Sequence, residues 1–91
     1  MPETAYAYLL LCADGSYYAG WTYDPQKRLK AHNSGRGAKY TRSRLPVSFA
    51  LIEPFDSKSD AMKREAALKK LRHSEKAALA LGFDPLSFGG I

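Results

Sequence analysis

The stretch AYAYLLLCADGSYYAGWT, residues 5–22, determines the fold class of this chain. Its first half, Ala5–Cys12, is continuously apolar and aromatic, which predicts a β-strand covered on both faces. An Asp-Gly pair follows, and this pair between two apolar runs is a strong hairpin signal. Tyr17–Thr22 is then the returning strand, in which Gly20 predicts a bulge or a close approach by another backbone or a ligand.

A helix and a basic loop are predicted after the hairpin. Asp24-Pro25 can begin the helix, because Asp caps free N–H groups and Pro suits the first helical position. The helix continues to Asn33, and Gly35 or Gly37 ends it. A loop rich in basic residues then extends to Arg44.

The second half of the chain predicts one strand and two helices. Val47–Glu53 alternates weakly and predicts a third strand. Ser57 begins a segment that resembles a capping box and predicts a helix to about Arg72. Ser74 can cap a last short helix, which Gly82 ends.

The predicted order of elements is strand, strand, helix, strand, helix, helix. A tight hairpin precedes the first helix, so the sheet is at least partly antiparallel and the fold class is α+β. Ninety-one residues with 45% hydrophobic content indicate one globular domain, residues 1–91. We expect its core at about residues 5–81 and an irregular tail at residues 82–91.

Composition excludes several classes of protein. The single cysteine excludes an internal disulfide, and with two histidines the chain cannot build a closed Cys/His zinc site. The longest apolar run, residues 5–13, is far shorter than the roughly 20 residues of a membrane span. No basic segment precedes this run, so we expect no signal peptide, no membrane association and a cytoplasmic protein.

Basic residues concentrate in one part of the chain. The net charge is +5, and no acid occurs between Asp24 and Glu53, where half of the 14 basic residues lie. Such a one-signed stretch is typical of contact with a phosphate backbone, although a solvated loop is the plainer alternative. Aromatic residues in or beside it could stack on bases. The predicted nucleic-acid contacts are Lys27, Arg36, Lys39, Tyr40, Thr41, Arg42 and Arg44.

Five residues are candidates for chemistry, and each has a plainer interpretation. Tyr8 and Tyr18 suit a strand core, but two hydroxyls on facing strands suggest a polar pocket. Arg28 is either a solvated helix residue or a phosphate clamp, and His32 shares its helix face. Glu65 lies on a partly apolar helical arc, where a carboxylate is paired or acts as a ligand.

The ordered set of these positions resembles the GIY-YIG nuclease family. The two motifs are Tyr6-Ala7-Tyr8 and Tyr18-Ala19-Gly20, followed by Arg28, His32 and Glu65 in matching order and approximate spacing. Tyr6, Ala7 and Ala19 depart from the family pattern, whereas both tyrosines and the glycine are retained. The segment GRGAKYTR, residues 35–42, further resembles the small single-domain bacterial branch, the UPF0213-like proteins.

The resemblance implies a three-stranded antiparallel sheet flanked by about three helices. It also implies a phosphodiester-hydrolysing site of two tyrosines, an arginine, often a histidine, and a glutamate that holds one divalent metal. In this chain these are Tyr8, Tyr18, Arg28, His32 and Glu65, with Glu65 as the metal ligand. A single carboxylate suits Mg²⁺ or Mn²⁺, which keep waters and accept phosphate oxygens. Whether Tyr8 or His32 is the general base stays open.

The expected substrate is DNA, single-stranded or branched, with little sequence preference, and RNA stays open. The chain offers little surface for reading a duplex, and we expect a monomer. One alternative is a nucleic-acid-binding module without activity. Another is a subunit whose protein partner supplies substrate choice, through an apolar patch around Trp21 or residues 83–88.

Overall fold

The computed structural model describes residues 3–84 and contains the predicted three-stranded antiparallel sheet. The strands are β1 (Ala5–Leu11), β2 (Tyr17–Thr22) and β3 (Ser48–Phe55), in the spatial order β2-β1-β3. β1 is therefore the central strand, which explains its continuous apolar sequence. Tyr8 pairs with Gly20 of β2 and with Ile52 of β3.

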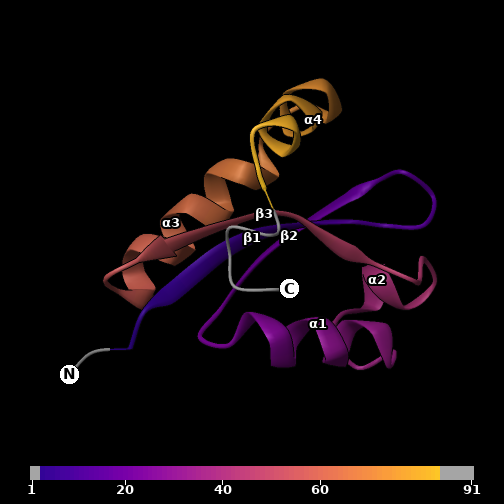
Figure 1. Cartoon of the computed structure of the whole chain (residues 1–91), viewed down its shortest axis with the longest axis horizontal. Coiled ribbons are helices and arrows are strands. Elements are labelled where there is room, and N and C mark those ends of the chain that lie inside the picture. Colours follow the sequence, from indigo (N-terminus) through magenta and orange to yellow (C-terminus); the bar gives the residue numbers. More distant parts are fainter. Residues whose placement is uncertain (1–2, 85–91) are drawn as a thin grey trace.

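Helices cover both faces of the sheet, as Figure 1 shows. The helices α1 (Pro25–Asn33) and α2 (Lys39–Arg42) lie on one side, and α3 (Lys58–Lys69) and α4 (His73–Leu81) lie on the other. None of the helices within residues 3–84 is long and apolar enough to cross a membrane.

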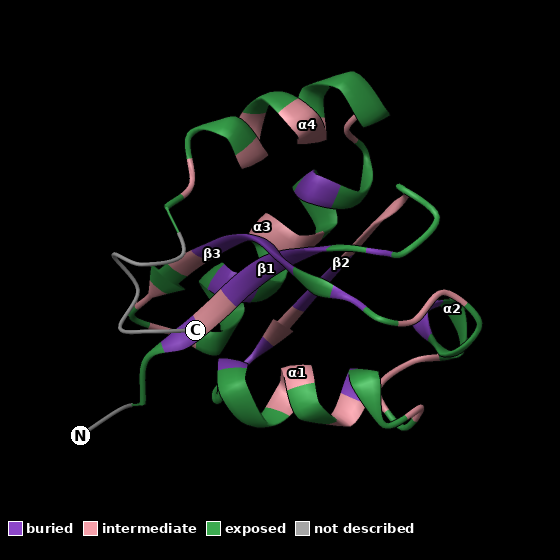
Figure 2. Ribbon diagram, turned by 45° about the vertical axis from the view of Figure 1, so that its right-hand side comes forward, coloured by how far each residue is buried: buried purple, intermediate pink, exposed green. Residues whose placement is uncertain are grey.

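Each face of the sheet has its own hydrophobic cluster, and burial is deepest along β1 and β3 (Figure 2). On the α3 side, Ala7 and Leu9 pack with Leu68. On the α1 side, Tyr8 and Leu10 pack with neighbours that include Phe49 and Ile52. Successive residues of a strand point to opposite faces, so one central strand supplies both clusters.

Local signals at the hairpin and the first helix are confirmed. Gly15 has a φ of 84°, the left-handed conformation that glycine adopts most easily in a tight turn. Asp24 accepts a hydrogen bond from the Lys27 N–H at 3.1 Å and caps α1. Gly35, also at a φ of 84°, follows the end of α1, as one of the two predicted stop positions.

Several boundaries differ from the sequence prediction. The basic segment predicted as loop contains the four-residue helix α2, and β3 begins and ends later than Val47–Glu53. α3 ends at Lys69 rather than about Arg72. The cap of α4 is Arg72 and not Ser74, because the Glu75 carboxylate accepts the Arg72 N–H at 2.9 Å.

Two further expectations concern Gly20 and the tail. The β1–β2 register is regular through Gly20, and the register shift lies instead between β1 and β3, at Leu9 and Leu10. Gly20 is thus a site of close approach and not of a bulge. Phe83 is half-buried against both clusters, and residues 85–91 of the expected tail lie outside the described residues.

Candidate active site

A buried hydrogen-bonded chain links Tyr8, His32 and Thr41. The Tyr8 hydroxyl lies 2.9 Å from His32 Nε2, and His32 Nδ1 lies 2.9 Å from Thr41 Oγ1. The Thr41 hydroxyl donates its proton to the Ala38 carbonyl oxygen at 3.1 Å, so towards His32 it acts as an acceptor. Nδ1 therefore carries the imidazole proton, and Nε2 accepts the hydrogen bond that the Tyr8 hydroxyl donates.

Two glycines make room for this chain. A Cβ at Gly20 would lie 2.4 Å from the Tyr8 hydroxyl oxygen, so the phenol crosses the β2 strand only because Gly20 has no side chain. A Cβ at Gly37 would lie 2.2 Å from His32 Nδ1 and 2.7 Å from His32 Cα. Gly37 therefore closes the loop over the imidazole at van der Waals distance.

Replacing Gly37 with alanine is expected to destabilise the fold. The new methyl group overlaps both the ring and the backbone of His32, so we expect a loss of about 1–3 kcal/mol in the free energy of unfolding, measured by urea denaturation. Gly82→Ala is the matched control, since its nearest neighbour would be the Leu79 carbonyl oxygen at 3.7 Å. Equal stability of Gly37→Ala and Gly82→Ala would contradict the packing of Gly37 on His32.

Arg28 lies within electrostatic range of the Tyr8–His32 pair. Burial lowers the pKa of His32, and the positive charge of Arg28 lowers it further. Burial also raises the pKa of Tyr8; Arg28 opposes this shift, while Tyr18 and Glu65 add to it. The guanidinium is partly buried and makes no hydrogen bond or ion pair with any residue from 3 to 84. Arg28 is thus a cation within electrostatic range of the Tyr8–His32 pair, and among residues 3–84 it has no acidic partner.

The lowered pKa of His32 predicts how stability depends on pH. The unfolded chain protonates this histidine as the pH falls through about 6.5, whereas the folded chain protonates it only at lower pH, so the free energy of unfolding falls as the pH falls. NMR titration of the imidazole signals should show His32 titrating below pH 6.5. A His32 signal that titrates at or above pH 6.5 would contradict the neutral, buried imidazole.

Tyr18 also contacts His32. Its ring centroid is 5.4 Å from that of His32 and 6.0 Å from that of Tyr40, with which it stacks. The Arg44 guanidinium lies 3.8 Å above the Tyr40 ring and pairs with Asp14 at 3.0 Å. Tyr40 and Arg44 thus form a fixed aromatic–cationic stack beside Tyr18.

Glu65 reaches the cluster from α3, on the opposite face of the sheet. Its side chain is 20% exposed, and its carboxylate lies 3.5 Å from Lys69 Nζ. Within residues 3–84, no group of three His, Cys, Asp or Glu side chains could hold a metal. A single carboxylate of this exposure is nevertheless a suitable oxygen ligand for Mg²⁺ or Mn²⁺, which take most other ligands from water and phosphate.

The seven residues predicted to contact nucleic acid fall into three groups. Lys27, Arg36, Lys39 and Arg42 are exposed, and Tyr40 is 38% exposed. Arg44 is half-buried and held by Asp14. Thr41 has no exposed surface and bonds His32, so in this structure it contacts the imidazole and offers no surface to a nucleic acid.

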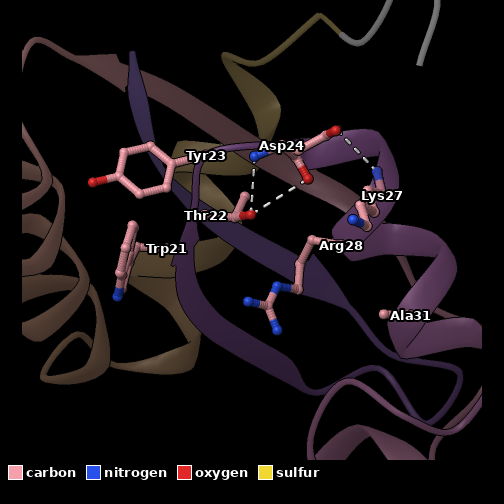
Figure 3. A pocket seen from close by; sticks show the side chains of 7 residues that line it. All are labelled: Trp21, Thr22, Tyr23, Asp24, Lys27, Arg28 and Ala31. Atoms are coloured by element: carbon pink, nitrogen blue, oxygen red, sulfur yellow. Dashed lines mark hydrogen bonds between the residues drawn. The ribbon is translucent and has the colours of Figure 1, made fainter. Parts of the chain in front are cut away.

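A cleft of about 390 Å³ lies at the end of β2 and was not predicted from the sequence. Figure 3 shows Trp21 and Tyr23 on one side of the strand end and Arg28 on the other. The lining is completed by Thr22, Asp24, Lys27 and Ala31. From the sequence, Trp21 is predicted only as part of an apolar docking patch for a protein partner.

Known proteins share both the sequence and the fold. The GIY-YIG catalytic domain matches residues 4–78. A UPF0213 protein of Halobacterium salinarum is 51% identical over 74 residues, covering 81% of this chain and 96% of the relative. A UPF0213 protein of Streptococcus pneumoniae is 53% identical over 76 residues, covering 84% of this chain and 77% of the relative.

Two solution structures agree with the fold. The E. faecalis protein EF2693 is 49% identical, with a TM-score of 0.56, and the match covers 82% of this chain and 80% of that one. A UPF0213 protein from Bacillus halodurans is 41% identical, with a TM-score of 0.52, and the match covers 96% of this chain and 86% of that one. The chain therefore belongs to the GIY-YIG catalytic domain family, and its relatives at about half identity are UPF0213 proteins.

Proposed function

We propose that this chain is a metal-dependent nuclease that hydrolyses phosphodiester bonds in DNA, with single-stranded or branched DNA favoured. The observation that supports it most is Arg28, a partly buried cation with no acidic partner in residues 3–84, next to a neutral Tyr8–His32 pair. A guanidinium binds phosphate oxygens through two parallel charge-assisted hydrogen bonds. Such a group stabilises the charge that grows on a phosphoryl group during hydrolysis.

The Tyr8–His32 hydrogen bond suits the activation of water. Tyr8 donates to His32 Nε2, so its oxygen has lone pairs free to accept a hydrogen bond from an attacking water. As the water oxygen bonds to phosphorus, the bond between phosphorus and the leaving sugar oxygen breaks, and that oxygen takes a proton from solvent. One proton of the attacking water passes to the Tyr8 oxygen, and the Tyr8 proton passes to His32 Nε2. This relay avoids a free phenolate, which burial disfavours.

The remaining roles follow from position. Glu65 would hold Mg²⁺ or Mn²⁺, which when bound neutralises phosphoryl charge and helps to acidify water. Tyr18, packed on His32, would orient the phosphate or the water. Thr41 holds the imidazole in the tautomer that can accept the Tyr8 proton.

The test is cleavage of end-labelled DNA. Single-stranded, duplex and flapped DNA and single-stranded RNA of one sequence are incubated with Mg²⁺, Mn²⁺ or EDTA. We expect cutting only with metal, and fastest on single-stranded or flapped DNA. Retained binding without cutting of any polymer, with either metal, would contradict the proposal and favour a binding module or a subunit that depends on a protein partner.

The exposed cations of α2 are expected to contribute to affinity through phosphate contacts. Replacing both Lys39 and Arg42 with alanine should weaken binding and flatten the slope of log K against log salt by about 0.7–0.9 per contacting cation. The measurement is fluorescence anisotropy with labelled DNA at several salt concentrations. Lys63→Ala with Lys70→Ala is the matched control, because both are exposed lysines, one within α3 and one at its C-cap, and α3 covers the face of the sheet opposite α2. An equal change in slope for both pairs would contradict a specific role for α2.

A further inference from the structure

We propose that the cleft at the end of β2 is a binding subsite for one unpaired nucleobase, beside the phosphate that Arg28 holds. This inference rests on the proposed function and names the substrate feature that the site requires. The cleft volume, about 390 Å³, lies in the range of small-ligand sites, about 300–1,000 Å³.

The aromatic residues that line the cleft do not pack in the hydrophobic core. Trp21 and Tyr23 belong to neither hydrophobic cluster, and Tyr23 is 43% exposed. The two rings contact each other edge to face at 5.2 Å, and Lys58 Nζ lies 5.7 Å from the Trp21 ring centroid. The two aromatic rings are thus held in place by each other and by a cation, at the surface. Stacking on a base is the interaction that such rings supply in single-strand binding proteins.

The cleft has a charged side at the start of α1 and an aromatic side formed by Trp21 and Tyr23. Arg28 and Lys27 are cations on the α1 side. Asp24 also lines the cleft, and its carboxylate already caps α1 through the Lys27 N–H. A carboxylate repels phosphate but accepts hydrogen bonds from the amino groups of bases and from sugar hydroxyls. Trp21 and Tyr23 lie across the strand end from Arg28, so the lining fits a base that is directed away from the guanidinium.

The geometry restricts the substrate class. A base that is paired and stacked within a duplex cannot enter a cleft unless it leaves the stack, which costs free energy. A base in a single strand or a flap is already available. The subsite therefore selects nucleic acid that is unpaired at the cut.

Trp21 fluorescence tests the subsite without any cutting, because this is the only tryptophan in the chain. The titrations are made in EDTA with a short single-stranded DNA, the same strand in a blunt duplex, and an abasic strand of equal length. Anisotropy of labelled strands measures binding separately. We expect quenching of Trp21 by the strand with bases, and unchanged emission when the abasic strand or the duplex binds.

Two variants complete the test. Trp21→Leu is expected to weaken binding of the strand with bases about tenfold and of the abasic strand less than twofold. Tyr23→Leu keeps the fluorescent reporter and replaces an exposed side chain, so it serves if Trp21→Leu does not fold. Equal losses for both strands in Tyr23→Leu would overturn the subsite.

The outcomes separate this inference from the proposed nuclease function. Metal-dependent cutting together with DNA binding that leaves Trp21 emission unchanged would overturn the subsite alone, and would leave the aromatic pair as a surface for a protein partner. Equal quenching by duplex and single strand would overturn the requirement for an unpaired base. Absence of binding to every strand would overturn both proposals.

Discussion

Replacing Glu65 with glutamine is expected to abolish metal-dependent cutting while DNA binding persists. Glutamine keeps the size of the side chain and removes the negative charge that attracts a divalent cation. Glu65 is the only carboxylate among the residues that shift the pKa of Tyr8. Its loss therefore leaves the cluster without an anionic metal ligand.

The measurement is the single-turnover cleavage rate in Mg²⁺ and in Mn²⁺, with anisotropy in EDTA for binding. Glu53→Gln is the matched control, because Glu53 also pairs with a basic residue of α3, Arg64 at 2.7 Å, but lies on β3 at the opposite edge of the sheet. We expect Glu53→Gln to cut at nearly the wild-type rate. A cleavage rate of Glu65→Gln within a few-fold of the wild-type rate would show that Glu65 is not the metal ligand.

The Lys69 contact does not complicate this test. The Glu65–Lys69 pair spans one helical turn, and Lys69 is 57% exposed. Exposed pairs at this spacing contribute only about 0.3–0.5 kcal/mol. Glu65→Gln should thus stay folded. A thermal unfolding curve near that of wild type would show that a loss of cutting is not caused by unfolding.

The sequence predicted those parts of the fold that depend on local chemistry. β1 was predicted as buried on both faces from its apolar run, and its central position in the sheet confirms this. Asp24 and the Asp-Gly turn before Ser16 were predicted from capping and turn preferences, and both occur. In each case the residues that decide the structure are close in sequence.

The elements that were missed depend on contacts between distant residues or on competition between neighbours. α2 is four residues long and has no apolar periodicity, so nothing local distinguishes it from a loop. Its one buried residue, Thr41, is held by His32, nine positions earlier. At α4, Ser74 is a good cap by type, but the Glu75 carboxylate reaches the Arg72 N–H and starts the helix earlier.

In the candidate site, too, the sequence predicts residue identities but not the contacts between distant residues. The order of motifs predicts Tyr8, Tyr18, Arg28, His32 and Glu65 as site residues, and this stays a prediction; the hairpin register brings Tyr8 opposite Gly20. The hydrogen bond that Tyr8 donates to His32 could not be predicted, because it depends on the docking of α1 against the sheet. The cleft at Trp21 was also missed, since an exposed aromatic residue in a strand has the same sequence pattern whether it contacts ligand, protein or water.

Arg28→Ala is expected to lower the cleavage rate by two or more orders of magnitude. Loss of one preorganised donor to a developing oxyanion typically costs about 10²–10³ in rate. The expectation applies here because the Arg28 guanidinium has no other partner in the described chain. Arg28→Lys should recover only part of the rate, because an ammonium cannot make two parallel bonds to phosphate.

Lys30→Ala is the control for charge alone. Lys30 is an exposed cation on the same helix and does not line the cleft at β2. Its loss should weaken DNA binding slightly through long-range electrostatics and leave the single-turnover rate of bound DNA nearly unchanged. Equal cleavage rates for Arg28→Ala and Lys30→Ala would show that Arg28 is a solvated helix residue and does not bind the reacting phosphate.

A second measurement on Arg28→Ala does not depend on activity. The positive charge of Arg28 lowers the pKa of His32, so its removal should raise the pH at which the His32 imidazole signal titrates. A raised titration point together with a slow cleavage rate would place the guanidinium at the Tyr8–His32 pair and at the reacting phosphate. An unchanged titration point would contradict that placement even if the rate fell, because a cation close enough to act on the phosphate must also act on the imidazole beside it.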